Sequence, residues 1–566
     1  MTQTQKTGKP AKVKTKRPSL LNHFFHQSDL GSNLGREIAA GILLCFLGVC
    51  GIFMNMQLVC RYIYDFTAMD AAAMGEAYAS YYFLAMVLAF AGTLLMGIFA
   101  RLPLVQISGL GISTVLITTL GVGSGLSYAN LLAVCFVSSL LYIVLFGIPA
   151  VRKAILGAIP ESVRRALPAA FGVLLAFVAL QLTGLVSFVA SPLTVTGTGT
   201  VLNLSKIQKI NPQVQIASNV QLGSLFDFAA YNGAAYKGDS YFPLIQVCLI
   251  AVVVTFVAYA LLRKTKHPML YSLLIGTLGY FVGYLCTVVF YFTKNGALQF
   301  ELDSLWARLW MVGSEDAMHL HLPTIFANLS VGKLLTEGFD FTAFTENGGN
   351  VTLLFLTGIF TNLALMAGNT DAVLLACDAS DATDEGRAHL CGGIINAVSP
   401  LFGQTGMCVS PVSVSAARDG AKSGVAAVVA AIFYAVSAFV WIVPFLFATT
   451  TSYDIQFNQY GHYGVVLAML TDNSFLVADA VMVLTGLYMA VTSLRGKLDF
   501  GDSAKVIPFV TTVLFTFVLT NPVLGICAGI LAHLFVSIFD RQRHLTLGNI
   551  LAALVSLGYI ALTLVG

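Results

Sequence analysis

The stretch that decides the fold is Pro103-Leu-Val-Gln-Ile-Ser-Gly-Leu-Gly111, which has a counterpart at Gly403-Gln-Thr-Gly-Met-Cys-Val-Ser-Pro411. Each stretch interrupts an apolar run with residues that break helices. Hydrocarbon cannot hydrogen-bond to bare backbone, so irregular backbone at membrane depth persists only where protein buries it or where it lines a cavity. Matched breaks in the two halves of a membrane chain therefore indicate the substrate site of a transporter.

The composition fits a protein that crosses the membrane many times. Of the 566 residues, 57% are hydrophobic and 10% are charged, whereas about a quarter of a soluble domain is charged. Crossing a bilayer takes roughly 20 apolar helical residues. Apolar runs, some of them richer in Gly, Ser and Thr, occur at residues 37–58, 80–100, 104–121, 129–149, 166–189, 243–262, 269–292, 351–376, 388–402, 404–420, 425–448, 474–494, 503–539 and 546–565. We therefore expect an all-α polytopic membrane protein with about 14 transmembrane segments.

The last two runs need separate comment. The run 503–539 is broken at Asn521-Pro522, which predicts two short segments or one bent hairpin. The terminal stretch 546–566 is expected to form an additional C-terminal apolar helix.

The polar segments predict the topology. Residues 1–36 form a basic tail, and basic segments stay on the cytoplasmic side, so we expect a cytoplasmic N-terminus and a multi-pass protein of the plasma membrane, or of the inner membrane in a Gram-negative organism. Such a tail sets topology, and no nucleic-acid partner is expected. Two polar inserts, 190–242 and 293–350, are then external. They are either surface elaborations or a lid that captures substrate.

No pattern points to an enzyme, a metal or a cofactor. The 10 cysteines are scattered through apolar runs without a C-x-x-C pair, and the 9 histidines show no metal-ligand spacing. No phosphate-binding loop, nucleophile elbow or zinc-helix motif occurs in the chain. We therefore expect no catalytic residues, no metal site and no cofactor.

Each break has the pattern of a short strand followed by a half-helix. Leu104–Ile107 and Thr405–Val409 are strand-like, and Ser108 and Ser410 are good helix N-caps. Gly109 and Gly111 let another backbone come close. Two half-helix N-termini that converge at mid-membrane would offer free N–H groups and partial positive charge to a ligand. Alternatively, the small residues only permit tight helix packing.

Beyond the breaks, several patches share a family likeness. Gly35–Ile42, Leu175–Gln181, Gly403–Gly424 and Lys505–Pro508 resemble the nucleobase-cation symporter 2 family, in particular its purine permease branch. The resemblance implies the uracil-permease-like fold, with about 14 segments in two inverted repeats of seven and substrate held between the third and tenth segments.

The same resemblance implies domains and a function. The first repeat would span 37–292, with the insert 190–242, and the second would span 351–545, after the insert 293–350. The implied function is secondary active transport of a purine nucleobase or a similar small planar solute by alternating access. The lipid bilayer, a coupling cation and a second copy of the chain in a homodimer are the implied partners.

The chain departs from the family at its acidic positions. Thr357, Phe360 and Val412 stand where the family has carboxylates. Without them the half-helix dipoles are not compensated, which favours anions or acceptor-rich solutes and predicts weak or absent proton dependence. An anion transporter of the same fold is therefore an alternative, and a non-transporting membrane sensor or assembly subunit is another.

Polar residues on the implied site segments are the candidates for substrate binding. They are Asn55, Gln106, Ser108, Gly109, Thr361, Asn362, Asn369, Gln404, Thr405 and Ser410. Asp371 is the nearest remaining acid. It is either the coupling group or a cap or ion-pair member at the cytoplasmic end of its segment.

Overall fold

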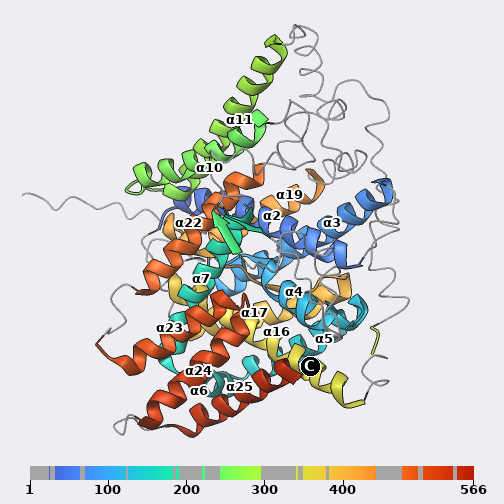
Figure 1. Ribbon diagram of the computed structural model, residues 1–566, viewed down its shortest axis with the longest axis vertical. Coiled ribbons are helices and arrows are strands. Elements are labelled where there is room, and N and C mark those ends of the chain that lie inside the picture. Colours follow the sequence, from blue (N-terminus) through green and yellow to red (C-terminus); the bar gives the residue numbers. More distant parts are fainter. Residues whose placement is uncertain are drawn as a thin grey trace, which may run out of the picture.

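The computed structural model of the chain is largely helical (Figure 1). It describes residue 25 and residues 32–63, 71–122, 125–182, 186–189, 219–222, 242–294, 339–341, 348–377, 382–440, 474–494, 501–539 and 545–565. Most of the basic tail and of the two polar inserts lies outside these described residues, so their expected roles stay predictions.

Most of the apolar runs form helices, because a helix pairs its backbone N–H and C=O groups internally where lipid cannot. The helices are α2 (Leu34–Ile63), α3 (Ala71–Leu95), α4 (Leu110–Val115), α5 (Tyr128–Gly147), α6 (Pro149–Ala158), α7 (Glu161–Leu182), α10 (Phe242–Leu262), α11 (Pro268–Lys294), α16 (Gly348–Ala376), α17 (Ala382–Val398), α18 (Ser413–Arg418), α19 (Val425–Val440), α22 (Ser474–Leu494), α23 (Ser503–Val518), α24 (Pro522–Phe539) and α25 (Leu547–Val565). Two π-helical turns, η1 (Met96–Ala100) and η2 (Leu116–Val122), and a 3-10 turn, η4 (Ser399–Phe402), complete them.

Among the described residues, 7 helices are long and apolar enough to cross a membrane, and shorter apolar helices accompany them. This confirms that the chain is mostly helical and has several helices that can cross a membrane. The count of about 14 spans and the inverted repeat stay predictions. The run 503–539 forms two helices, because Asn521 Oδ1 accepts the amide of Val523 at 3.0 Å and so caps α24 immediately before Pro522.

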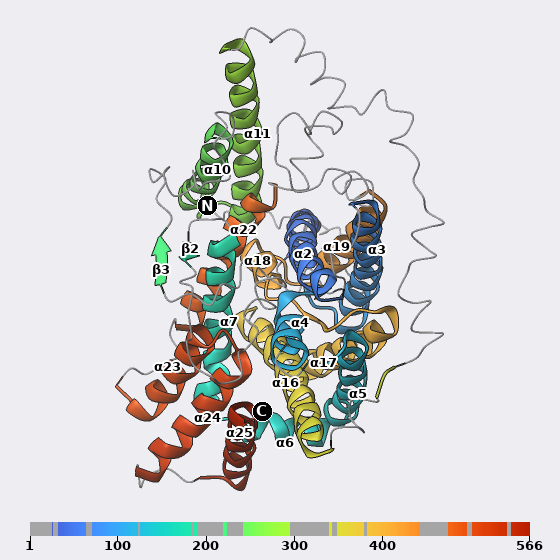
Figure 2. The ribbon, with the colours of Figure 1, turned by 45° about the vertical axis from the view of Figure 1, so that its right-hand side comes forward.

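The described helices form two bundles, which lie side by side in Figure 2. The crossover bundle consists of α2, α3, α4, α5, α16, α17, α18 and α19, and the α7 bundle consists of α7, α10, α11, α22, α23 and α24. Small residues set the closest approach in the α7 bundle. A Cβ added to Gly172 of α7 would lie 2.5 Å from the carbonyl oxygen of Gly486 in α22, so the two backbones touch.

The two sequence breaks meet inside the crossover bundle. Strand β1 (Gln106–Ser108) pairs antiparallel with β4 (Met407–Val409), and Ile107 lies opposite Cys408. All six strand residues are buried. The predicted short strands are therefore present, and their pairing satisfies backbone groups that lipid could not satisfy. A second small pair, β2 (Val186–Val189) with β3 (Asn219–Leu222), lies at the first insert.

The predicted helix starts need correction. The N-cap of α4 is Gly109, without a side-chain cap, because the Ser108 hydroxyl contacts Asn55 and Tyr81 instead. In the second break the Ser410 hydroxyl accepts the amide of Val412 at 3.4 Å, but α18 begins only at Ser413.

Candidate functional site

The crossover carries a polar cluster that joins three parts of the chain around Tyr81 of α3. Asn55 of α2 donates its amide to the Tyr81 hydroxyl at 2.8 Å and to the Ser108 hydroxyl of β1 at 2.6 Å. Gln404, just before β4, donates to the Tyr81 carbonyl at 3.3 Å. Asn55, Ser108 and Gln404 are completely buried. We call these four residues the Tyr81 cluster.

Two acceptors in the Tyr81 cluster have no partner among the described residues, namely Asn55 Oδ1 and Gln404 Oε1. The orientation of the Gln404 amide is fixed, because its nitrogen faces a backbone carbonyl, which can only accept. Native proteins leave few buried acceptors unsatisfied, and water or a ligand commonly supplies the missing donor. The cluster is therefore ready to accept N–H or O–H groups.

Other predicted residues hold the crossover together. Ser113 of α4 donates to the Thr405 carbonyl at 2.8 Å, and the two hydroxyls lie 3.2 Å apart. Asn369 of α16 donates to the Cys408 sulfur at 3.3 Å. Helix α16 therefore contacts β4 at the crossover.

Glycines shape the same region. An added Cβ at Gly109 would lie 3.9 Å from the Ile107 side chain, an ordinary van der Waals contact, so a methyl group fits there. Gly406 has a φ of 69°, and an added Cβ would lie 2.6 Å from Ile112 of α4. Only glycine fits at Gly406.

Three predicted binding residues form contacts outside the Tyr81 cluster. Gln106 donates to the Gly392 carbonyl at 2.8 Å and to the Met407 carbonyl at 3.2 Å, which ties β1 to α17 and β4. Thr361 lies 3.1 Å from the Tyr559 hydroxyl of α25. Asn362 forms a separate buried group with Ser138 of α5 and Asn396 of α17.

The positions where the family has acids hold no carboxylate here. Thr357 donates its hydroxyl to the Leu353 carbonyl of its own helix at 2.9 Å. Phe360 is 38% exposed on the bundle surface, and Val412 is buried.

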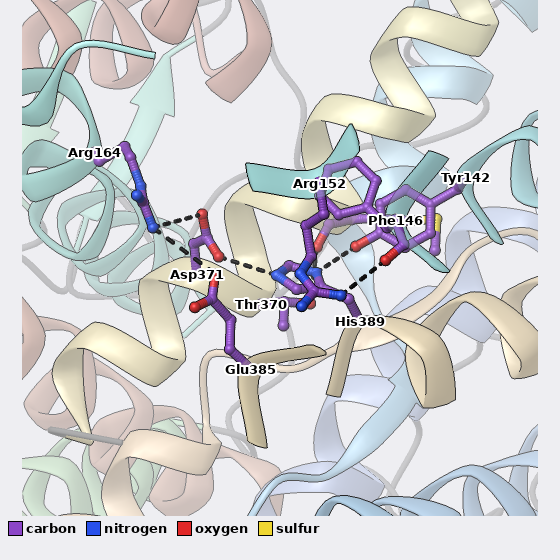
Figure 3. Close-up of polar contacts among 9 residues, drawn as sticks. Tyr142, Phe146, Arg152, Arg164, Thr370, Asp371, Glu385 and His389 are labelled. Atoms are coloured by element: carbon purple, nitrogen blue, oxygen red, sulfur yellow. Dashed lines mark hydrogen bonds and ion pairs between the residues drawn. The ribbon is translucent and has the colours of Figure 1, made fainter. Parts of the chain in front are cut away.

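Asp371 lies in a charged group at the C-terminal end of α16, shown in Figure 3. Its carboxylate is 3.2 Å from His389 Nε2 and 3.6 Å from the Arg164 guanidinium of α7. Arg164 also lies 4.0 Å from Glu385. The Tyr142 hydroxyl lies 2.5 Å from His389 Nδ1. The Nε2–H tautomer of His389 fits both contacts, since it donates to Asp371 and accepts the Tyr142 hydroxyl at Nδ1.

This charged group links the two bundles, since Arg164 belongs to the α7 bundle and its partners to the crossover bundle. The ligand atoms of Asp371, Glu385 and His389 all lie within 4.8 Å of one another, which is close enough to share a metal ion. The Arg164 guanidinium already supplies positive charge to both carboxylates. The structure thus places Asp371 in an ion pair.

Sequence reasoning missed Tyr81, Ser113, His389 and Arg164, although each contacts a predicted residue. A signal was available for His389 and Arg164, because ionisable side chains are rare in apolar helices. Tyr81 and Ser113 carried none, since aromatic and small hydroxyl residues are common in membrane helices.

Comparison with known proteins supports the permease resemblance. A scan against protein-family models found no match. The chain is 28% identical over 180 residues to the guanine/hypoxanthine permease PbuG of Bacillus subtilis, covering 31% of this chain and 39% of that protein. It is 27% identical over 185 residues to "Putative permease MJ0326" of Methanocaldococcus jannaschii, covering 32% of this chain and 39% of that protein. Over about a third of its length the chain is thus similar to a guanine/hypoxanthine permease and to a putative permease.

The matches span 39% of the length of either relative. Solved structures with a more distant likeness are the transmembrane domain of a cyanobacterial bicarbonate transporter, BicA, and SLC26A9. The first is 15% identical with a TM-score of 0.34, covering 81% of this chain and 97% of that one. The second is 11% identical with a TM-score of 0.38, covering 92% of this chain and 69% of that one. With its apolar helices and permease relatives, the chain is a multi-pass membrane protein.

Proposed function

We propose that this chain is a secondary transporter that carries a purine nucleobase, or a similar small planar solute, across the plasma membrane. The substrate binds at the crossover of β1 and β4, and relative movement of the two bundles exposes it to either side in turn. The relationship to PbuG, whose name gives guanine and hypoxanthine as substrates, supports this solute class. The paired breaks support the location, because irregular backbone at membrane depth marks transporter sites.

The observation that carries the proposal is the pair of unpaired buried acceptors, Asn55 Oδ1 and Gln404 Oε1. A nucleobase presents ring N–H and amino donors along its planar edge, and carbonyl oxygens are the matching acceptors. Leaving both oxygens unsatisfied costs about 1–3 kcal/mol each, so a solute that donates to them gains affinity over one that cannot.

Gly109 completes the arrangement. It follows β1 directly and is the N-cap of α4, and an added Cβ would lie 3.9 Å from Ile107. Absence of a side chain there lets a flat ring approach the backbone. The peptide N–H groups that follow Gly109 can then bind a carbonyl oxygen of the solute.

An anion carrier of the same fold is the second candidate, and one observation favours it. No carboxylate stands at Thr357, Phe360 or Val412, so nothing at these positions repels a negative charge. Against it, the oxygens of Asn55 and Gln404 carry partial negative charge and would face an anion without donating to it. We therefore favour the neutral, donor-bearing solute.

A binding panel tests the choice. Purified protein is incubated with guanine, hypoxanthine, adenine, uracil, sulfate and bicarbonate, and the shift in thermal unfolding is measured for each. Purines should stabilise the protein most, because binding to the folded state alone raises its stability. Uptake of the best solute into proteoliposomes then shows transport. Stabilisation by sulfate or bicarbonate alone would overturn the purine assignment.

A further inference from the structure

A second acid, Asp479, lies inside the membrane region and was not among the sequence candidates. It occupies the second turn of α22 and is 4% exposed. The Cys50 thiol of α2 donates to Asp479 Oδ1 at 3.1 Å. Because α2 belongs to the crossover bundle and α22 to the α7 bundle, this hydrogen bond crosses the boundary between the bundles (Figure 2).

The contact lies at the depth of the candidate substrate site. Cys50 is near the middle of the 30-residue helix α2. An added Cβ on the next residue, Gly51, would lie 3.1 Å from Ile107 of β1. One turn further, Asn55 bonds to Ser108. The same stretch of α2 therefore touches both the crossover and Asp479.

Within the described part of the chain, no Lys, Arg or His pairs with Asp479. The other charged groups near α22 have partners of their own. Arg418 of α18 lies 5.6 Å from the Tyr488 ring, about 13 Å further along α22. Arg164 of α7 pairs with Asp371 of α16.

The other described neighbours of α22 offer no cation to Asp479. Asp419 accepts the Met269 amide at the start of α11 at 3.0 Å, and the α10 sequence has no charged residue. Of the titratable groups in the described residues, Cys50 is the one that contacts Asp479.

A carboxylate buried in a membrane protein without a cation is costly, so such a group is neutral unless it is paired or hydrated. Asp371 already pairs with Arg164 across the bundle boundary, which suits a fixed link between the bundles. Among the described residues, the donor to Asp479 is a thiol.

We propose that Asp479 is the proton-binding group that couples transport to a proton gradient. This inference rests on the proposed function. When the bundles pack as in this structure, Asp479 holds a proton; when they part during alternating access, water reaches the carboxylate and the proton leaves. A proton taken up from one side is thus released on the other, and the side chain returns to its starting state. Sodium is disfavoured, because it requires several oxygen ligands and Cys50 offers sulfur.

With Asp479 as the proton-binding group, transport depends on the proton gradient, in contrast to the weak proton dependence expected from the sequence. That expectation followed from the missing acids at Thr357, Phe360 and Val412, and it considered only the positions that the family uses. Asp479 supplies a carboxyl group from another helix, α22, which meets α2 at Cys50.

Two measurements on the full-length protein test the proposal. The first is infrared spectroscopy of purified protein, which detects the carbonyl band of a protonated carboxylic acid without any transport. Asp479→Asn should remove one such band between low and high pH. Asp502→Asn is the matched control, because Asp502 caps α23 and Asn caps equally well. A band that persists in Asp479→Asn overturns the proposal.

The second measurement is uptake of hypoxanthine into proteoliposomes, with and without a proton gradient and with and without a sodium gradient. Asp479→Asn should abolish stimulation by the proton gradient and retain exchange of internal for external hypoxanthine. Full proton stimulation in this variant, or stimulation by sodium alone in the native protein, overturns the proposal. If hypoxanthine is not transported but the infrared band disappears in Asp479→Asn, the proposed function fails and proton binding at Asp479 stands.

Should Asp479→Asn fail to fold, Cys50→Ala provides a second route. Removal of the thiol donor should shift the infrared band of Asp479 without removing it, since the carboxyl group stays in place. An unchanged band in Cys50→Ala would show that the protonated acid is a different residue.

Discussion

Replacement of Gln404 by Met tests the site most directly. Met keeps the length of the side chain and removes the unpaired oxygen that we assign to substrate recognition. A neutral hydrogen bond contributes about 0.5–1.5 kcal/mol net, which corresponds to an increase in Kd of about 2- to 13-fold. The internal bond to the Tyr81 carbonyl is also lost, but at 3.3 Å it is long. Most of the effect should therefore appear in binding.

The control is Thr361→Val, which has nearly the same shape. Sequence reasoning placed Thr361 in the site, whereas its hydroxyl contacts Tyr559 of α25 in the structure. Hypoxanthine affinity is measured by equilibrium binding on purified protein, and thermal unfolding checks that each variant is folded. Gln404→Met should weaken binding and Thr361→Val should leave Kd unchanged. The reverse result would show that the Tyr81 cluster is structural and that the site lies nearer α25.

Three further outcomes are expected. Gly109→Ala should fold normally, because its methyl group would lie 3.9 Å from Ile107, but it should bind substrate weakly, because the methyl group occupies the place of the solute. Gly406→Ala should also lower the melting temperature, since it places a carbon 2.6 Å from Ile112 of α4. Equal melting temperatures of the two variants would contradict this. Asp371→Asn should destabilise the protein by about 1–3 kcal/mol, because Arg164 and His389 both lose their carboxylate partner. Arg164→Gln in the same chain should restore part of the loss in thermal unfolding, and an additive double variant would refute the coupling. Gly172→Val should lower the free energy of unfolding by about 1–3 kcal/mol, because it separates α7 from α22. The change is read from the melting temperature, and an unchanged melting temperature would argue against close packing there.

The strand crossover shows how far local sequence reaches. Gly and Ser within apolar runs predicted a strand followed by a half-helix at both breaks, and β1 and β4 are present. Ser108 was expected to cap α4, because Ser is a good N-cap in isolation. In the structure Asn55 and Tyr81 come within hydrogen-bond distance of its hydroxyl. Both partners come from other helices, so no local pattern could have revealed them.

The polar residues of α16 show the same limit. Thr361, Asn362 and Asn369 are close in sequence, yet they contact α25, α5 and β4 respectively. A helix has 3.6 residues per turn, so neighbouring residues face different directions. Which of them faces the site depends on how the surrounding helices pack.

By itself the sequence determined the membrane class, because apolar composition and run length depend only on the bilayer that the chain must cross. It also determined where the helices break, since Pro, Gly and Ser act on their immediate backbone. Only the tertiary structure decided which polar groups meet. Asp479 and Cys50 are separated by 429 residues, and their contact exists because α2 and α22 pack together. Contacts of this kind depend on how whole helices pack, and the local sequence around either residue carries no signal for them.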